Sequence, residues 1–218
     1  MLEAKFQNLK EEIHGYYLHV EKMYQDTITG ILNHDTEVLT KIVEIEEPLA
    51  NEKELKIDEL CIDLLALYGP RGKQLRTIIM IMKMNNDLER IADHCVNISE
   101  SALRLIHTPG FRNLSSQMLQ MTDYVKIMLY DAFYSFANED TALAKDVLKR
   151  DDIVDDIHHQ NVRNLVSDIE HKTQLAETFV DLLLLSSNLE RIADLATNIA
   201  EDVIYIVEGK TYKHGKFE

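Results

Sequence analysis

Apolar residues recur at steps of three and four positions along most of this 218-residue chain. This spacing places them on one face of an α-helix, because a helix completes a turn in about 3.6 residues. Glycine (7) and proline (3) are scarce, whereas all-β folds need many of both in their turns. The pattern therefore predicts an all-α protein of long helices. Its two clearest apolar stripes are Met84, Leu88, Ile91, Cys95, Ile98, Ala102 and Leu105, and Leu185, Leu189, Ile192, Ala196, Ile199, Val203 and Ile206.

Breaks in this pattern divide the chain into six predicted helices, three in each half. Asp35 and Asp140 suit the N-cap position, where a short polar side chain accepts a hydrogen bond from a free backbone N–H. We therefore predict two similar three-helix bundles, residues 1–108 and 109–218, joined near Pro109 in an elongated molecule. The predicted helices run from about residue 2 to 30–34, 35 to 68, 71 to 107, 115 to 137, 140 to 172 and 174 to 208.

An internal repeat supports this division. Residues 86–100 read NDLERIADHCVNISE and residues 187–201 read SNLERIADLATNIAE, so nine of the fifteen positions are identical. Chance would give about one identity in such a window. The offset of 101 residues is close to half the chain, and a weaker repeat before the second helix of each half has an offset of 105. The two halves are therefore interpreted as copies of one helical unit.

The charge balance restricts the partners of the chain. Its 23 basic and 38 acidic residues give a net charge of −15, which repels nucleic-acid backbones and anionic lipid headgroups. Cations or a basic protein surface are the expected partners. No run of about 18 apolar residues and no apolar signal core are present, so we predict a cytoplasmic protein without membrane insertion. Cys61 and Cys95 lie far apart in apolar patterns and are predicted to be buried free thiols.

A line of polar side chains runs beside the apolar stripe of each third helix. Glu89 and Asp93 are four residues apart, so they lie one turn from each other, and Asn97 extends the line. Like charges at this spacing repel each other, and hard cations prefer carboxylate and amide oxygens. Duplication of the line in both halves favours a ligand over a plain solvated face. We therefore predict metal sites here, and the second copy consists of Glu190, Asp194 and Asn198.

The second helix of each half offers residues for the facing side of each site. Asp152 and Asp156 are four residues apart in the second half, and Glu47 and Asn51 are their equivalents in the first half. Pro48 should disrupt the first-half helix, because it lacks a backbone N–H. We therefore predict that the second-half site is the better formed.

Two other interpretations remain open. Glu11-x-x-His14 and Asp155-x-x-His158 resemble half-motifs of a di-iron carboxylate enzyme, and a metal-free helical adaptor would also fit. Nucleophile motifs, a glycine-rich phosphate loop and zinc-type cysteine pairs are absent, so we do not predict an enzyme. Arg90 and Arg191 point about 100° away from the preceding glutamates. We expect their stems to pack on a neighbouring helix, with the guanidinium groups in solvent.

The doubled Leu-Glu-Arg-Ile-Ala-Asp, followed each time by Asn-Ile after three further residues, resembles the PhoU family of bacterial phosphate-signalling proteins. Leu75-Arg76 and residues 202–210 are similar to the family as well, and the resemblance covers nearly the whole chain. It implies two three-helix bundles with multinuclear metal sites on the acidic motifs, which hold iron or zinc in some members. The carboxylate and amide oxygens themselves also suit manganese or magnesium. The resemblance also implies that the protein couples a phosphate ABC transporter ATPase to a membrane sensor histidine kinase, and that it represses phosphate-starvation genes when phosphate is plentiful.

Carried over by position, the resemblance implies a defined set of metal ligands. It also implies an association with the inner membrane only through protein partners, and we expect a homodimer. The chain departs from the family where Ala92 and Ala193 replace the usual glycines, and where Ala176-Glu177 stand in place of a second Leu-Arg. The implied ligands are Glu89, Asp93, Glu190 and Asp194, with Asn97 and Asn198 in support and Glu47, Asn51, Asp152 and Asp156 on the facing helices.

Overall fold

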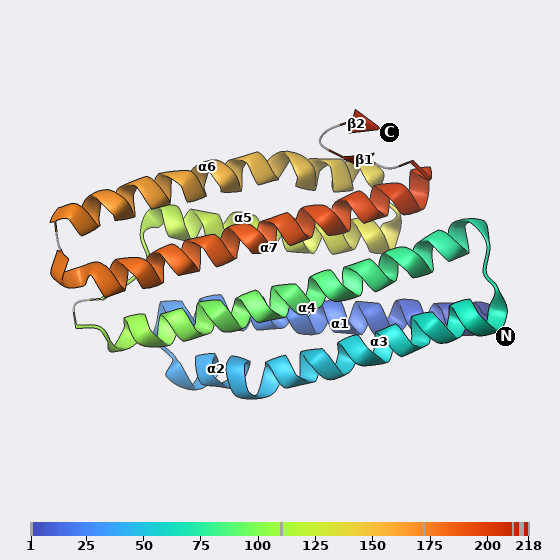
Figure 1. Ribbon diagram of the computed structural model, residues 1–218, viewed down its shortest axis with the longest axis horizontal. Coiled ribbons are helices and arrows are strands. Elements are labelled where there is room, and N and C mark those ends of the chain that lie inside the picture. The colour runs from blue at the N-terminus through green and yellow to red at the C-terminus, as the bar shows by residue number, and fades with distance from the viewer. Residues whose placement is uncertain (1, 110, 172, 211, 214–215, 218) are drawn as a thin grey trace.

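The computed structural model describes residues 2–109, 111–171, 173–210, 212–213 and 216–217. These residues are almost entirely helical, so the predicted all-α class is confirmed (Figure 1). A short antiparallel hairpin, β1 (Tyr212–Lys213) against β2 (Lys216–Phe217), follows the last helix. The helical elements are α1 (Leu2–Asn33), α2 (Thr36–Lys41), the π-helical turn η1 (Ile42–Glu46), α3 (Glu47–Tyr68), α4 (Gly72–His107), α5 (Ser116–Asn138), α6 (Thr141–His171), the 3-10 turn η2 (Thr173–Leu175) and α7 (Ala176–Glu208).

Polar side chains and a glycine define several helix ends, and Asp35 and Asp140 are N-caps as predicted. Asp35 accepts hydrogen bonds from the backbone N–H groups two and three residues ahead, both at 3.1 Å. Asp140 does the same at 3.0 Å. Gly209 ends α7 with a φ of 68°, a left-handed conformation that glycine adopts without strain. The Arg76 guanidinium lies against this glycine and donates to the carbonyl oxygen of Ile206 at 3.4 Å. Its positive charge is stabilising there, because the C-terminal end of a helix carries partial negative charge.

The predicted interruption near Pro48 takes the form of the π turn η1. Here the N–H of Glu47 bonds to the carbonyl oxygen of Ile42, five residues back. A π turn holds one residue more than an α turn, so the helix continues through the proline instead of ending there. Buried positions reveal the extra residue: Leu39 and Ala144 are 105 residues apart, whereas Ala50 and Val154, beyond the turn, are 104 apart.

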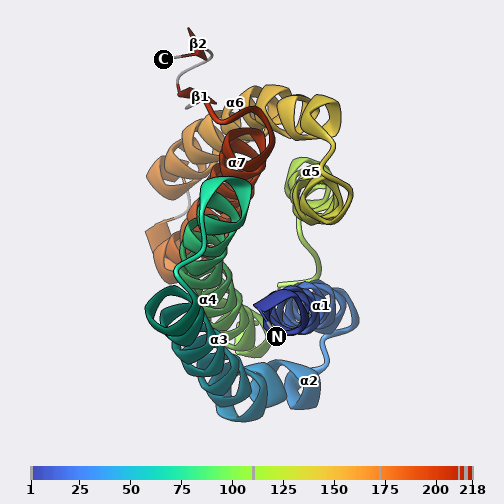
Figure 2. The ribbon, with the colours of Figure 1, turned by 90° about the vertical axis from the view of Figure 1, so that its right-hand side faces the viewer.

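The two bundles lie side by side with their helices along the long axis (Figures 1 and 2). Helix α4 of the first half packs along α7 of the second, and one continuous cluster of buried residues runs through both halves. Lys83 pairs with Asp202 at 3.4 Å and Arg104 with Asp181 at 2.8 Å, so the start of α4 meets the end of α7. The bundles are therefore joined along their whole length by antiparallel helices, and not only near Pro109 as the sequence suggested.

Two expectations from composition can be compared with the structure. Cys61 and Cys95 are buried and free, and burial raises the pKa of each thiol to about 12, so both are inert as nucleophiles. Among the described residues, we find no helix with the combination of length and apolarity that a membrane crossing requires.

Candidate functional site

The two copies of the repeated motif present their carboxylates as the helical pattern predicts. Leu88 and Leu189 are fully buried, whereas the glutamate that follows each leucine is half-buried at the edge of the core. Asp93 and Asp194, one turn further on, are exposed. Each motif therefore contributes one core line and one acidic line beside it.

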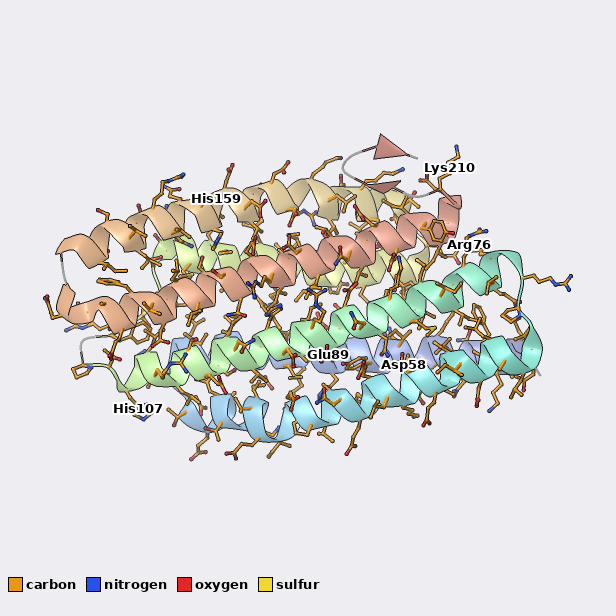
Figure 3. All side chains as sticks on the ribbon, viewed as in Figure 1. Asp58, Arg76, Glu89, His107, His159 and Lys210 are labelled. Carbon is orange, nitrogen blue, oxygen red and sulfur yellow. The ribbon has the colours of Figure 1, made fainter. Side chains whose placement is uncertain are left out.

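In the first half, the motif carboxylates face α3. Burial and then the charges of Asp93 and Glu54 raise the pKa of Glu89, and burial and then the charge of Glu47 raise the pKa of Asp93. Figure 3 shows Asp58 of α3 and Glu89 of α4 between these two helices. Burial followed by the Asp58 charge raises the pKa of Glu54. We call Glu47, Glu54, Asp58, Glu89 and Asp93 the first acidic row.

The predicted first-half pair lies at this row in spite of Pro48. The amide of Asn51 donates a hydrogen bond to the carboxylate of Glu47 at 2.6 Å. Disruption by the proline is limited to the π turn, which leaves α3 intact. Glu54 and Asp58 were missed by the sequence reasoning, although Glu54 follows Glu47 by seven residues and so returns to the same helix face.

In the second half, the prediction that Asp152 and Asp156 face the motif was wrong by one residue. Both are exposed. Asp151 and Asp155 are half-buried instead, and the charge of Asp155 contributes to the raised pKa of Glu190 after burial and Asp194. The alignment of the halves at an offset of 105 ignored the extra residue of the π turn, and one residue rotates a helical side chain by about 100°. We call Asp151, Asp155, Glu190 and Asp194 the second acidic row.

Negative charge is most crowded at Asp151. Burial, followed by the charges of Asp155 and Asp194, raises the pKa of Asp151 to about 7. Its Oδ1 atom is buried and has no hydrogen-bond partner among the described residues. Such an atom commonly marks the position of a water molecule or an ion.

Two buried polar groups lie beneath the first acidic row without partners in the described structure. Tyr16 is fully buried and its hydroxyl group has no acceptor. Burial and the charges of Glu54 and Glu89 raise the pKa of this hydroxyl, which places it close to the row. Asn85 donates to the Glu54 carbonyl oxygen at 2.9 Å and to Asp58 at 3.0 Å, but its own Oδ1 accepts nothing. The floor of the row thus offers one free donor and one free acceptor.

These residues fit a hard cation by their chemistry. Carboxylate and amide oxygens are the ligands that Mg²⁺, Mn²⁺ and iron take in proteins, and unpartnered oxygens lie at both rows. Among the described residues, however, no three histidine, cysteine, aspartate or glutamate side chains already surround one point as metal ligands would. A bound ion would therefore require the carboxylates to turn toward it, and metal binding stays a prediction.

A groove of about 530 Å³ lies between α4 and α7, where the two motifs meet. Because the helices are antiparallel, equivalent positions of the two copies line it together. The predicted support residues Asn97 and Asn198 are exposed in this groove, with Arg90 and Arg191 beside them. The amides therefore belong to the space between the two rows, next to Asp93 and Asp194, which line both the groove and their rows.

The half-motifs of a di-iron enzyme do not converge. Glu11 and His14 line a separate pocket between α1 and α5, where the His14 ring lies 5.5 Å from that of Phe133. His158 lies in the second bundle, where its Nδ1 is 3.0 Å from Ser186 Oγ. The two pairs therefore lie in different bundles, one on α1 and the other on α6.

Two three-helix bundles, each with an acidic motif on its third helix, define a class of tandem helical-repeat proteins. The PhoU domain matches residues 15–102 and again residues 118–203. The chain therefore belongs to the PhoU family, and the family and internal repeat expected from the sequence are confirmed.

Relatives and solved structures agree with this assignment. "Phosphate-specific transport system accessory protein PhoU homolog 1" of Thermotoga maritima is 32% identical over 211 residues, which cover 97% of this chain and 90% of that protein. The PhoU homolog of Aquifex aeolicus is 34% identical over 207 residues, covering 94% and 93%. The crystal structure of PhoU from Pseudomonas aeruginosa superimposes with a TM-score of 0.92 at 29% identity, over 96% of this chain and all of that one.

Proposed function

We propose that the chain is a cytoplasmic, non-enzymatic regulator of phosphate uptake and signalling. Membership of the PhoU family carries the proposal, because its relatives are named as accessory proteins of a phosphate-specific transport system. In this role the chain binds the ATPase of a phosphate ABC transporter and a membrane sensor histidine kinase, and represses the phosphate-starvation response. The net charge of −15 supports protein or cation partners over nucleic acid.

Co-purification tests the regulatory role. The full-length chain is immobilised and incubated separately with the transporter ATPase and with the cytoplasmic part of the sensor kinase. Retention of both is expected, together with release of phosphate-starvation gene expression when the gene is deleted. Retention of neither partner, with unchanged expression in the deletion strain, would contradict the proposal.

We also propose that the two acidic rows bind metal ions. The residues would hold a cation through their carboxylates, and a bound cation would supply the positive charge that offsets the repulsion within each row. The unpartnered Tyr16 hydroxyl and Asp151 Oδ1 support this part of the proposal. The second candidate is a metal-free helical adaptor, which is favoured by the lack of three ligands already arranged around one point in the described residues.

Elemental analysis of protein purified without chelator separates these two candidates. We expect stoichiometric iron, zinc, manganese or magnesium, and its loss in the double variant Glu89→Ala/Glu190→Ala. The matched control is Asp152→Ala/Asp156→Ala, which removes two exposed carboxylates near the second row. Equal metal content in both variants, or none in the unmodified chain, would favour the adaptor.

A further inference from the structure

The groove between α4 and α7 is built from the same positions of both repeats. Three pairs of identical residues related by the 101-residue offset line it: Arg90 and Arg191, Asp93 and Asp194, and Asn97 and Asn198. His94 and Leu195 form a fourth pair at this offset, in which the residue type differs. The antiparallel contact of α4 with α7 brings these pairs together in the middle of the molecule. The repeat therefore places two arginines, one from each bundle, in one groove.

These two arginines are poorly occupied by the protein itself. Arg191 forms no hydrogen bond or ion pair within the described part of the chain, although its charge opposes the rise in the pKa of Glu190 and of Asp194. Arg90 has one ion pair there, with Asp87, at the long distance of 3.7 Å. Both side chains are exposed in the groove. Both guanidinium groups are thus accessible to a ligand that enters the groove.

The two guanidinium groups line one groove and act on one side chain within it. That side chain is the His94 imidazole. Burial lowers its pKa most, and the charges of Arg191 and Arg90 lower it further, whereas a hydrogen bond with Asn188 raises it. The His94 ring is held by that hydrogen bond, in which Nδ1 lies 2.8 Å from Asn188 Oδ1. Two cations in one groove, neither held by a close ion pair, form a binding element for an anion.

We propose that this groove binds the phosphoryl group of a small phosphate ester between Arg90 and Arg191. A planar guanidinium group matches the oxygens of a phosphate with two parallel hydrogen bonds, which makes arginine well suited to this ligand. The amide groups of Asn97 and Asn198 are further donors on the same walls. A volume of about 530 Å³ is the size of a small-molecule site and exceeds the space that free phosphate needs, so the ester fills it better.

Asp93 and Asp194 connect this groove to the acidic rows. Each carboxylate lines the groove and also belongs to a row, so two negative charges oppose the two arginines. A cation held by the rows offsets these carboxylates and leaves the arginine charge available to the ester. This coupling rests on the proposed metal binding, and it makes the groove bind its anion more tightly in the metal-loaded chain.

Calorimetric titration of the full-length chain tests the proposal. The probes are AMP, inorganic phosphate and adenosine, each added to metal-loaded and metal-stripped protein whose metal content is measured in the same samples. We expect AMP to bind, adenosine to bind at least tenfold more weakly, and Arg90→Ala/Arg191→Ala to weaken AMP binding at least tenfold. The matched control is Arg163→Ala, which removes an exposed arginine of α6 outside the groove.

The outcomes separate the two proposals. Phosphate that binds as tightly as AMP supports the phosphoryl site and identifies free phosphate as its ligand. AMP binding that ignores the arginine substitutions, or adenosine binding equal to AMP binding, overturns the site. Metal-loaded protein that binds neither AMP nor phosphate also overturns it and leaves the metal proposal intact. Protein that retains no metal overturns the coupling. The phosphoryl site is then tested by whether the unmodified chain binds AMP more tightly than Arg90→Ala/Arg191→Ala.

Discussion

The two halves share a motif but differ in what lies beneath it. In the first half, the Tyr16 hydroxyl and Asn85 Oδ1 have no partners among the described residues. In the second half, Ser186 Oγ lies 3.0 Å from His158 Nδ1 and accepts from Asn161 at 3.4 Å, which closes the floor with the protein's own hydrogen bonds. Three pairs of positions are equivalent in the two halves: Tyr16 and Met121 at an offset of 105, Asn85 and Ser186 at 101, and Glu54 and His158 at 104.

This difference shows that duplication of the acidic line did not produce two identical sites. The floor of the first row leaves a donor and an acceptor free. An imidazole lies near each row, since the His94 charge acts on Asp93 and the His159 charge acts on Glu190. The rows therefore differ in the floor and not in the type of donor around them. We expect the first row to be the better-prepared site, contrary to the prediction from Pro48.

The largest expected effect concerns a packing difference between the halves. A Cβ atom on Gly30 would lie 2.9 Å from the Leu39 side chain, and the equivalent residues are Ser135 and Ala144. Leu39→Ala should lower the free energy of unfolding by about 2–5 kcal/mol, and Gly30→Ser by about 1–3 kcal/mol through overpacking. The double variant should cost less than the sum, because the serine fills the space that the leucine leaves. A double-mutant cycle in urea measures this. Strictly additive costs would show that a serine at position 30 does not fill the space left by the Leu39 side chain.

Tyr16→Phe tests the open floor of the first row. If the hydroxyl supports a metal ligand or its bound water, its removal should weaken metal retention by this row about 10–100-fold, as the loss of a supporting hydrogen bond does in other sites. Competition with a metal-chelating dye measures the affinity. Tyr17→Phe is the control, since the Tyr17 side chain is also buried but its hydroxyl lies near Glu21 instead of the row. Equal effects of both substitutions would remove the special role of Tyr16.

Helix capping should be the same in both halves. Asp35→Ala and Asp140→Ala each remove two side-chain hydrogen bonds of 3.0–3.1 Å. Each should cost about 1 kcal/mol of unfolding free energy, measured by thermal denaturation. A clearly larger cost in the first half would indicate that the π turn makes its second helix depend more on the cap.

The smallest effect is expected at Asp151 and depends on pH. Its pKa of about 7 in the folded chain is above the value near 4 of an unfolded aspartate. The ionised carboxylate therefore destabilises the fold above pH 7, and this cost disappears as the pH falls from 7 toward 4. Without metal, Asp151→Asn should stabilise the chain at pH 8 by about 1 kcal/mol after allowance for solvent screening, with almost no gain at pH 4.

Asp152→Asn is the control for this pH dependence, because Asp152 is an exposed neighbour. The comparison uses the difference from the unmodified chain, since burial also raises the pKa of Asp202 to about 7 and adds a similar slope. Equal stability of the two variants at pH 8 would show that Asp151 is not the crowded carboxylate of the second row.

The sequence alone determined the helices, the repeat and the position of the acidic line. These follow from periodicity within a single helix: Leu88 and Glu89 are neighbours on one helix, so their relative direction needs no partner. The same local reasoning identified Asp35 and Asp140 as caps.

Only the tertiary structure decided which residues face these lines. Whether Asp151 or Asp152 turns toward Glu190 depends on a single residue of helical register, and the π turn before Pro48 shifts that register in one half only. The meeting of Arg90 and Arg191 likewise follows from the antiparallel packing of α4 on α7. A helix pattern contains no information on the rotation or direction of its neighbour, because burial of apolar surface is satisfied by many arrangements. The choice among them is made by packing and charge between segments far apart in the chain.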